Sequence, residues 1–132
     1  MQLAYVALIL LAVPLALYRG GAALQACAVV VGLNWAVLSA WVFLTGDTDA
    51  EIAFLLADLV SLYLILAHAG ETMPGQMLAS SYAGQMLMHV THIAGHGDAW
   101  YYWALLTTIG YGQLAILLFG SLAYRSAGRG LC

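Results

Sequence analysis

Three of the four histidines stand close together in the segment QMLMHVTHIAGH, residues 85–96. They are His89, His92 and His96, and spacings of three and four residues place side chains on one face of a helix. Two imidazoles spaced in this way can share a metal ion. Imidazole is also the side chain that exchanges protons near neutral pH. The segment therefore points to metal binding or to proton transfer.

Polar residues before the histidines extend this face. At 100° per residue, Ser81 and Gln85 fall with the three histidines within an arc of about 80°. Such an arc is not expected to face lipid, because a polar group without a partner costs free energy there. We therefore expect it to turn toward other helices or toward water.

The composition is that of an integral membrane protein. Of the 132 residues, 64% are hydrophobic and 7% are charged, whereas a soluble domain has about 25% charged residues. We expect residues 1–132 to form a single transmembrane helical domain whose first partner is the lipid bilayer. The chain has no lysine and three arginines, so a basic patch for nucleic acid is not expected.

The apolar runs predict an all-α bundle of five transmembrane helices. A crossing needs about 20 residues, with a range of about 17–25. Four runs read as crossings, although the first reaches this range only if it starts at Met1. The remaining run, Gln76–Ala94, is doubtful because it carries the polar face. The expected segments are Leu3–Tyr18, Ala22–Thr45, Ala50–Ala69, Gln76–Ala94 and Trp100–Tyr124.

The arginines predict the orientation. If all five segments cross, Arg19 and the tail with Arg125 and Arg129 lie on the same side. Positive charge gathers on the cytoplasmic side of a membrane, so we expect the N-terminus outside and the C-terminus inside a cell inner membrane. The aromatic run WYYW, Trp100–Trp103, then falls at the outer interface, where we expect it to anchor the bundle.

The third segment carries an aspartate, Asp58, inside its apolar run. Counted from Ala50 at 1.5 Å per residue, it lies about 12 Å deep. On the antiparallel fourth segment, that depth falls between His89 and Gln85. We predict a polar intramembrane site at this level, made of Asn34, Asp58, Gln85, His89 and Thr107.

Two roles are open for this predicted site. A hydrogen-bonded pair of Asp58 and His89 could simply fix how the helices pack. The same pair could instead relay protons or ions, since an ionisable group inside a membrane is costly and often functional.

A metal site is the alternative reading of the histidines. His89, His92 and His96 could bind a metal, with Glu51 or Asp98 completing the ligands. The chain has no HExxH motif and no cysteine near these histidines, so we expect no cofactor.

Haem bound by two histidines needs them at one depth on different helices. His68 is the only histidine outside the fourth segment, and it lies near the opposite end of the third. Haem is therefore disfavoured within one chain.

The middle half of the chain carries a pattern of isolated residues. It consists of an NW pair at Asn34-Trp35, a TG turn at Thr45-Gly46, the intramembrane Asp58, and a Q-x-x-x-H at Gln85 and His89. In these features the chain resembles small multi-pass membrane proteins encoded by tailed phages and proteobacteria. Most of those proteins are uncharacterised, so the resemblance implies a membrane setting and no mechanism.

Three functional hypotheses follow. The first is a non-enzymatic inner-membrane protein of bacterial or phage origin, holin-like or accessory, which acts by associating with a second copy or with a partner membrane protein. The second is a proton or ion channel or transporter unit that uses Asp58 and His89. The third is a metal- or haem-binding membrane redox protein. Nothing in the sequence supports a nucleophilic enzyme, because the serines lack a GxSxG motif or a base beside them.

Overall fold

The computed structural model describes residues 2–46, 51–95 and 98–128, and it confirms the all-α class. The helices of this described part are α1 (Gln2–Arg19), α2 (Ala22–Thr45), α3 (Glu51–Ala69), α4 (Met73–Ile93) and α5 (Ala99–Gly128). The helix α2 has the predicted bounds, whereas α4 begins earlier and α5 ends later than predicted. Ala50, the expected first residue of the third segment, lies outside the described residues.

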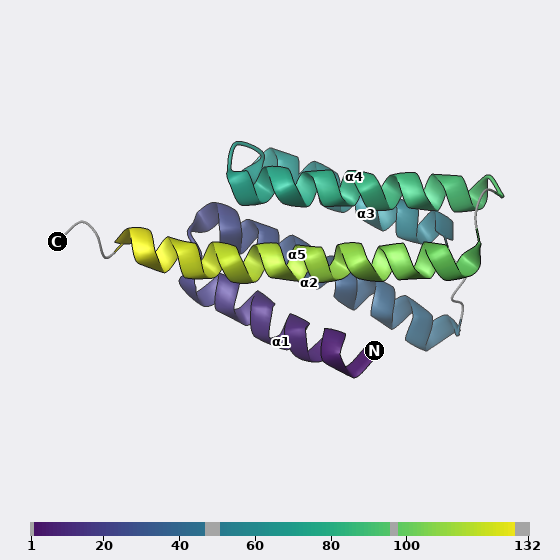
Figure 1. The fold of residues 1–132 in the computed structure, drawn as a ribbon, viewed down its shortest axis with the longest axis horizontal. Coiled ribbons are helices and arrows are strands. Elements are labelled where there is room, and N and C mark those ends of the chain that lie inside the picture. Colours follow the sequence, from purple (N-terminus) through teal and green to yellow (C-terminus); the bar gives the residue numbers. More distant parts are fainter. Residues whose placement is uncertain (1, 47–50, 96–97, 129–132) are drawn as a thin grey trace.

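The helices form a bundle in which successive helices run in opposite directions (Figure 1). Each helix packs on the next in the sequence, and α5 closes the ring by packing on α1. Because α1, α3 and α5 run the same way, the α1–α2 and α3–α4 turns share one end of the bundle. We call this the Arg19 end, and the opposite end, where α5 begins, the Asp98 end.

The α3–α4 turn shows how local sequence sets this packing. Thr72 caps α4: its hydroxyl accepts a hydrogen bond from Gly75 N at 3.2 Å and donates one to Ala69 O at 2.7 Å. A Cβ atom on Gly75 would collide with the backbone oxygen of Ala69. Glycine therefore allows the start of α4 to lie directly against the end of α3, and this keeps the two helices adjacent.

Apolar side chains fill the half of the bundle nearer the Arg19 end. Alanines on α1 and α2 allow close helix contacts, and larger side chains from α3, α4 and α5 fill the remaining space. Fully or almost fully buried members of this core include Ala12, Ala16, Cys27, Ala28, Ile65, Leu78, Leu114 and Leu117. The buried Asp58 and His89 lie in the other half, whereas Ser121 is buried in the apolar half, where its hydroxyl donates to Leu117 O of its own helix.

Three helices in the described part, α2, α3 and α5, are long and apolar enough to cross a membrane. The helix α1 is apolar but shorter, and α4 is made less hydrophobic by its polar residues. Large apolar side chains also cover the outside of the bundle, where Leu3 and Phe43 are each 87% exposed. An exterior of this kind suits a lipid environment better than water.

Candidate functional site: a polar network beside a cavity

Asp58 is the charged residue at the centre of the network. It lies seven residues after the start of α3, which is about 10 Å along the helix. Only 2% of its surface is exposed. One carboxylate oxygen accepts a hydrogen bond from Asn34 Nδ2 on α2 at 2.9 Å, and the other lies 3.2 Å from His89 Nε2 on α4. The carboxylate therefore joins three helices.

His89 is equally buried and uses both ring nitrogens. While Nε2 faces Asp58, Nδ1 lies 2.7 Å from the hydroxyl of Tyr102 on α5. The chain Asn34–Asp58–His89–Tyr102 thus extends across α2, α3, α4 and α5. A connected chain of buried polar groups stabilises a particular packing of these helices, since each group loses a partner if one helix moves.

Donor and acceptor roles in this chain follow from simple chemistry. An ionised Asp58 can only accept, so Nε2 of His89 carries a hydrogen and donates it. In neutral His89 the other nitrogen accepts, and Tyr102 donates its hydroxyl proton to it. If His89 gains a proton, Nδ1 becomes a donor and the Tyr102 oxygen becomes its acceptor. The network can therefore hold an added proton after rotation of one hydroxyl group.

A second histidine connects this chain to the Asp98 end. The rings of His92 and Tyr102 stack with centroids 4.1 Å apart and planes 9° apart. His92 Nε2 also lies 3.6 Å from Glu51 Oε1, and both side chains are partly exposed. A row of protonatable groups thus leads from the partly exposed Glu51 to the buried Asp58.

A separate set of hydrogen bonds joins α4 to α5. Gln113 Nε2 donates to Gln85 Oε1 at 2.7 Å and to Ser81 Oγ at 3.2 Å. Gln113 is 4% exposed, so these bonds lie inside the bundle. They hold the middle of α5 against α4, closer to the Arg19 end than His89 is.

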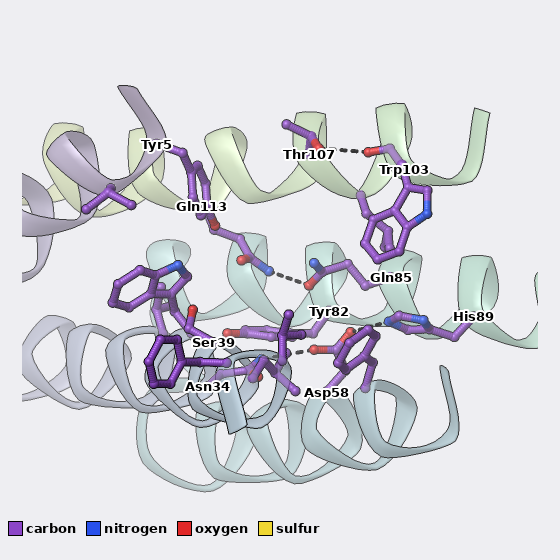
Figure 2. A pocket seen from close by; sticks show the side chains of 18 residues that line it. Tyr5, Asn34, Ser39, Asp58, Tyr82, Gln85, His89, Trp103, Thr107 and Gln113 are labelled. Atoms are coloured by element: carbon purple, nitrogen blue, oxygen red, sulfur yellow. Dashed lines mark hydrogen bonds and ion pairs between the residues drawn. The ribbon is translucent and has the colours of Figure 1, made fainter. Parts of the chain in front are cut away.

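Members of both sets, but neither Tyr102 nor Ser81, line a cavity of about 650 Å³ among the five helices (Figure 2). Ligand pockets typically measure about 300–1,000 Å³, so this volume suits a small organic molecule. Asp58 and His89 are the lining residues that can be charged, and the remaining wall is mainly apolar and aromatic. Its aromatic members are Tyr5, Trp35, Phe43, Phe54, Tyr82 and Trp103.

All five residues of the predicted polar site line this cavity. Asp58 is hydrogen-bonded to both Asn34 and His89, and Gln85 belongs to the second set. Thr107 joins neither, because its hydroxyl donates to Trp103 O one turn earlier in α5, at 2.7 Å (Figure 2).

The histidines of the alternative metal site are not brought together as ligands. His89 already uses both nitrogens, His92 faces Glu51, and His96 lies outside the described residues. In the part of the chain that the structure describes, no three His, Cys, Asp or Glu side chains are grouped as a metal site would require. His68 is exposed at the other end of α3, far along the helix from Asp58.

Two members of the networks were not predicted. Tyr102 was assigned to the interfacial aromatic run, which gave no reason to separate it from its neighbours. Its burial, 2% exposed against 64% for Tyr101, shows that it faces inward. Gln113 carried a usable signal, since a lone amide inside an apolar helix needs a partner just as Gln85 does.

Comparison with known proteins adds no relative: no protein-family model, curated protein or solved structure matches this chain. The function must therefore be argued from the geometry of the network and the cavity.

Proposed function

We propose that this chain is a non-enzymatic, multi-pass inner-membrane protein whose Asp58–His89 pair binds and releases a proton in the course of transport. The buried pair, 3.2 Å apart and in contact with a cavity, is the observation that carries the proposal. Uncompensated charge inside a membrane costs about 2.5–3.5 kcal/mol even on insertion scales. A group placed there is therefore expected to neutralise its charge by gaining a partner or a proton.

The proposed topology has five crossings, with the N-terminus outside and the C-terminus in the cytoplasm. The alternating helix directions support it, since they put Arg19 at the end of the bundle where α5 also ends. In this orientation the Asp98 end faces outward and the Arg19 end faces the cytoplasm, in accord with the preference of positive charge for the inside.

The proposed proton route begins at the outer end. Glu51 and His92 are partly exposed there, Tyr102 lies between His92 and His89, and Asp58 follows. His89 is within hydrogen-bonding distance of both Tyr102 and Asp58, whereas His92 only stacks on the Tyr102 ring, so a proton can pass inward from His92 only when its side chain moves. The route is thus a row of five side chains that ends at the cavity.

The apolar core at the Arg19 end favours a transporter, in which access to the cavity alternates between the two sides, and disfavours an open pore. Beyond Gln113 the interior is mostly apolar, with residues such as Leu78, Leu114 and Leu117, and the buried Ser121 bonds only the backbone of its own helix. A proton or ion that reaches the cavity from outside would have to wait for those helices to move. We therefore favour a transporter unit over a channel.

Proton flux in liposomes tests this proposal. The full chain is reconstituted with a pH-sensitive dye inside the vesicles, and a potential is imposed with potassium and valinomycin. We expect flux to fall about a hundredfold or more in Asp58→Asn and in His89→Ala, the lower end of what a positioned proton-transfer group contributes. Glu71→Gln, at the exposed α3–α4 turn, is the matched control and should keep full flux. Flux that survives both site substitutions would remove the proposed role of the pair.

Cysteine labelling tests the topology independently. Glu71→Cys and Asp98→Cys are made in a chain whose own cysteines, Cys27 and Cys132, are replaced by alanine. A membrane-impermeant maleimide added to intact cells should label residue 98 and spare residue 71. The reverse labelling would show that the bundle has the opposite orientation in the membrane. Equal labelling of both residues would show that α4 does not cross.

The holin-like alternative, in which the protein acts only by helix association, is less favoured than this proposal. A protein that only assembles into a lesion has no need of a buried His–Asp pair joined to four helices. Inducible expression distinguishes the two, because a holin-like protein abolishes the membrane potential rapidly and a gated transporter leaves cells growing.

A further inference from the structure

We propose that the cavity beside Asp58 binds a lipophilic organic cation, which exchanges with the proton held on the Asp58–His89 pair. This inference rests on the proposed function, because it uses the same pair, and it names the class of substrate. Size, charge, aromatic lining and access to the cavity each contribute to it.

Charge balance is the first argument. Among the described residues that line the cavity, Asp58 is the acid and His89 the only base. Arg19, the only arginine whose side chain the structure describes, lies at the far end of α1. When His89 is neutral, the pair keeps one negative charge in an apolar wall. A positively charged ligand in the cavity would neutralise this charge, so a cation is favoured over a neutral or anionic ligand.

The groups that face Asp58 from the other helices leave this balance unchanged. They are Tyr5 on α1, Asn34 on α2, Tyr82 and His89 on α4, and Tyr102 on α5. Phenols and amides are uncharged near neutral pH. Glu51 and His92 form their own pair nearer the Asp98 end. His89 is therefore the group whose proton a bound cation would replace.

The exchange is balanced in charge and atoms. Before binding, imidazolium at His89 neutralises the carboxylate of Asp58. The ligand then brings one positive charge into the cavity, and His89 releases one proton to water. No covalent bond other than the N–H bond of His89 is broken, and no further reactant is needed.

The wall supplies the rest of a cation site. The rings of Trp35, Phe54, Tyr82 and Trp103 line the cavity, and aromatic faces attract organic cations, especially where water is excluded.

Access from the lipid is the last argument. The exposed members of the cavity wall include Ser39 and Phe43 on α2 and Trp103 on α5. The cavity therefore opens at the side of the bundle, between α2 and α5, towards the Asp98 end. In the proposed topology this opening faces the outer leaflet, from which a lipophilic molecule can enter without crossing water.

Ethidium, an aromatic cation with N–H donors, is a suitable probe, and phenanthridine is the uncharged ring system that controls for hydrophobic partition. The purified full chain in detergent is dialysed against each compound, with protein-free micelles as the blank. A pH electrode in weakly buffered solution measures the protons released. We expect saturable ethidium binding, about one proton released per ligand, and an affinity that rises up to about tenfold per pH unit where exchange is complete. Phenanthridine should show neither saturation nor proton release.

Substitutions locate the effect. Asp58→Asn should abolish saturable ethidium binding, whereas His89→Gln should keep binding and lose its pH dependence. Glu71→Gln again serves as the matched acid control. If Asp58→Asn fails to fold, the unsubstituted protein still tests the exchange, through proton release and through the difference between ethidium and phenanthridine binding.

The outcomes separate this inference from the proposed function. No ethidium binding by a protein that keeps Asp58-dependent proton flux would overturn the substrate class and leave proton transport standing. Equal binding of ethidium and phenanthridine, or ethidium binding without proton release, would show a merely hydrophobic cavity and overturn the exchange. Loss of proton flux together with intact exchange would leave the ligand site and remove the proton route.

Discussion

The ring of Tyr102 lies flat against the imidazole of His92, with 4.1 Å between centroids and 9° between planes. The same tyrosine bonds His89 through its hydroxyl at 2.7 Å. One side chain thus contacts two histidines that are three residues apart on α4, and it does so through chemically separate parts. The ring contributes packing, and the hydroxyl contributes a hydrogen bond.

Replacing Tyr102 by phenylalanine separates these two parts. Tyr102→Phe keeps the ring stack and leaves Nδ1 of His89 without a partner in a buried site. We expect the free energy of unfolding, measured by denaturing-detergent titration, to fall by about 0.6–1.7 kcal/mol, the range found for hydrogen bonds between membrane helices. The neighbouring Tyr101→Phe is the matched control, since Tyr101 is 64% exposed. Equal losses in both variants would contradict an inward-facing hydroxyl.

Coupling between Asp58 and His89 is expected from their contact. Asp58→Ala strips an acceptor from both Asn34 and His89, and His89→Ala strips a donor from Asp58. Because each single change leaves a buried polar group unsatisfied, the double variant should lose less stability than the sum of the two. A double-mutant cycle should give a coupling energy of about 0.5–3 kcal/mol. A coupling near zero would mean that the pair contributes no joint stabilisation.

Much of the fold could be predicted because lipid-facing helices appear in the sequence as long apolar runs. Apolar runs of sufficient length located α2, α3 and α5. In the structure Asp98 accepts from Trp100 N at 2.7 Å and so caps the start of α5. The polar run in α4 was harder, because hydropathy alone does not distinguish a buried polar helix from one that lies on a surface.

The depth of the site residues along their helices could be predicted from the sequence, but the directions in which their side chains point could not. Counting 1.5 Å per residue brought Asp58 to a level between Gln85 and His89, and that estimate needs only two antiparallel helices. Which way Thr107 points depends on the rotation of α5, which the sequence does not determine. The role of Tyr102 depends on the same rotation, so its neighbours in the aromatic run concealed it.

Gly75 tests the close contact at the α3–α4 turn. A methyl group there would collide with the backbone oxygen of Ala69, so Gly75→Ala must push the helices apart. We expect a loss of about 1–3 kcal/mol, as for overpacking of a well-packed contact. Gly112→Ala is the matched control, because no atom lies within 4 Å of a Cβ built there. That control should be neutral or stabilising by about 0.5–1 kcal/mol, since alanine favours helix over glycine.

Metal binding should be weak and independent of His89. Both nitrogens of His89 are occupied, so a metal would have to displace Asp58 or Tyr102. We expect zinc to be substoichiometric in protein purified without chelator, and His89→Gln to leave that content unchanged. Stoichiometric zinc that disappears in His89→Gln would revive the metal hypothesis, and His92→Gln would then show whether the second histidine shares the ion.

The amide pair between α4 and α5 offers the sharpest test of buried polar satisfaction. Gln113→Leu alone leaves the carbonyl of Gln85 without its donor, so we expect a loss of about 1 kcal/mol in denaturing-detergent titration. Gln85→Met alone leaves the Gln113 amide with only Ser81 as acceptor, so its loss should be smaller. The double variant removes both partners, and apolar replacements of similar shape can be nearly neutral. It should therefore recover most of the stability lost in Gln113→Leu. Losses that simply add would show that the two glutamines act through packing and not through the bond between them.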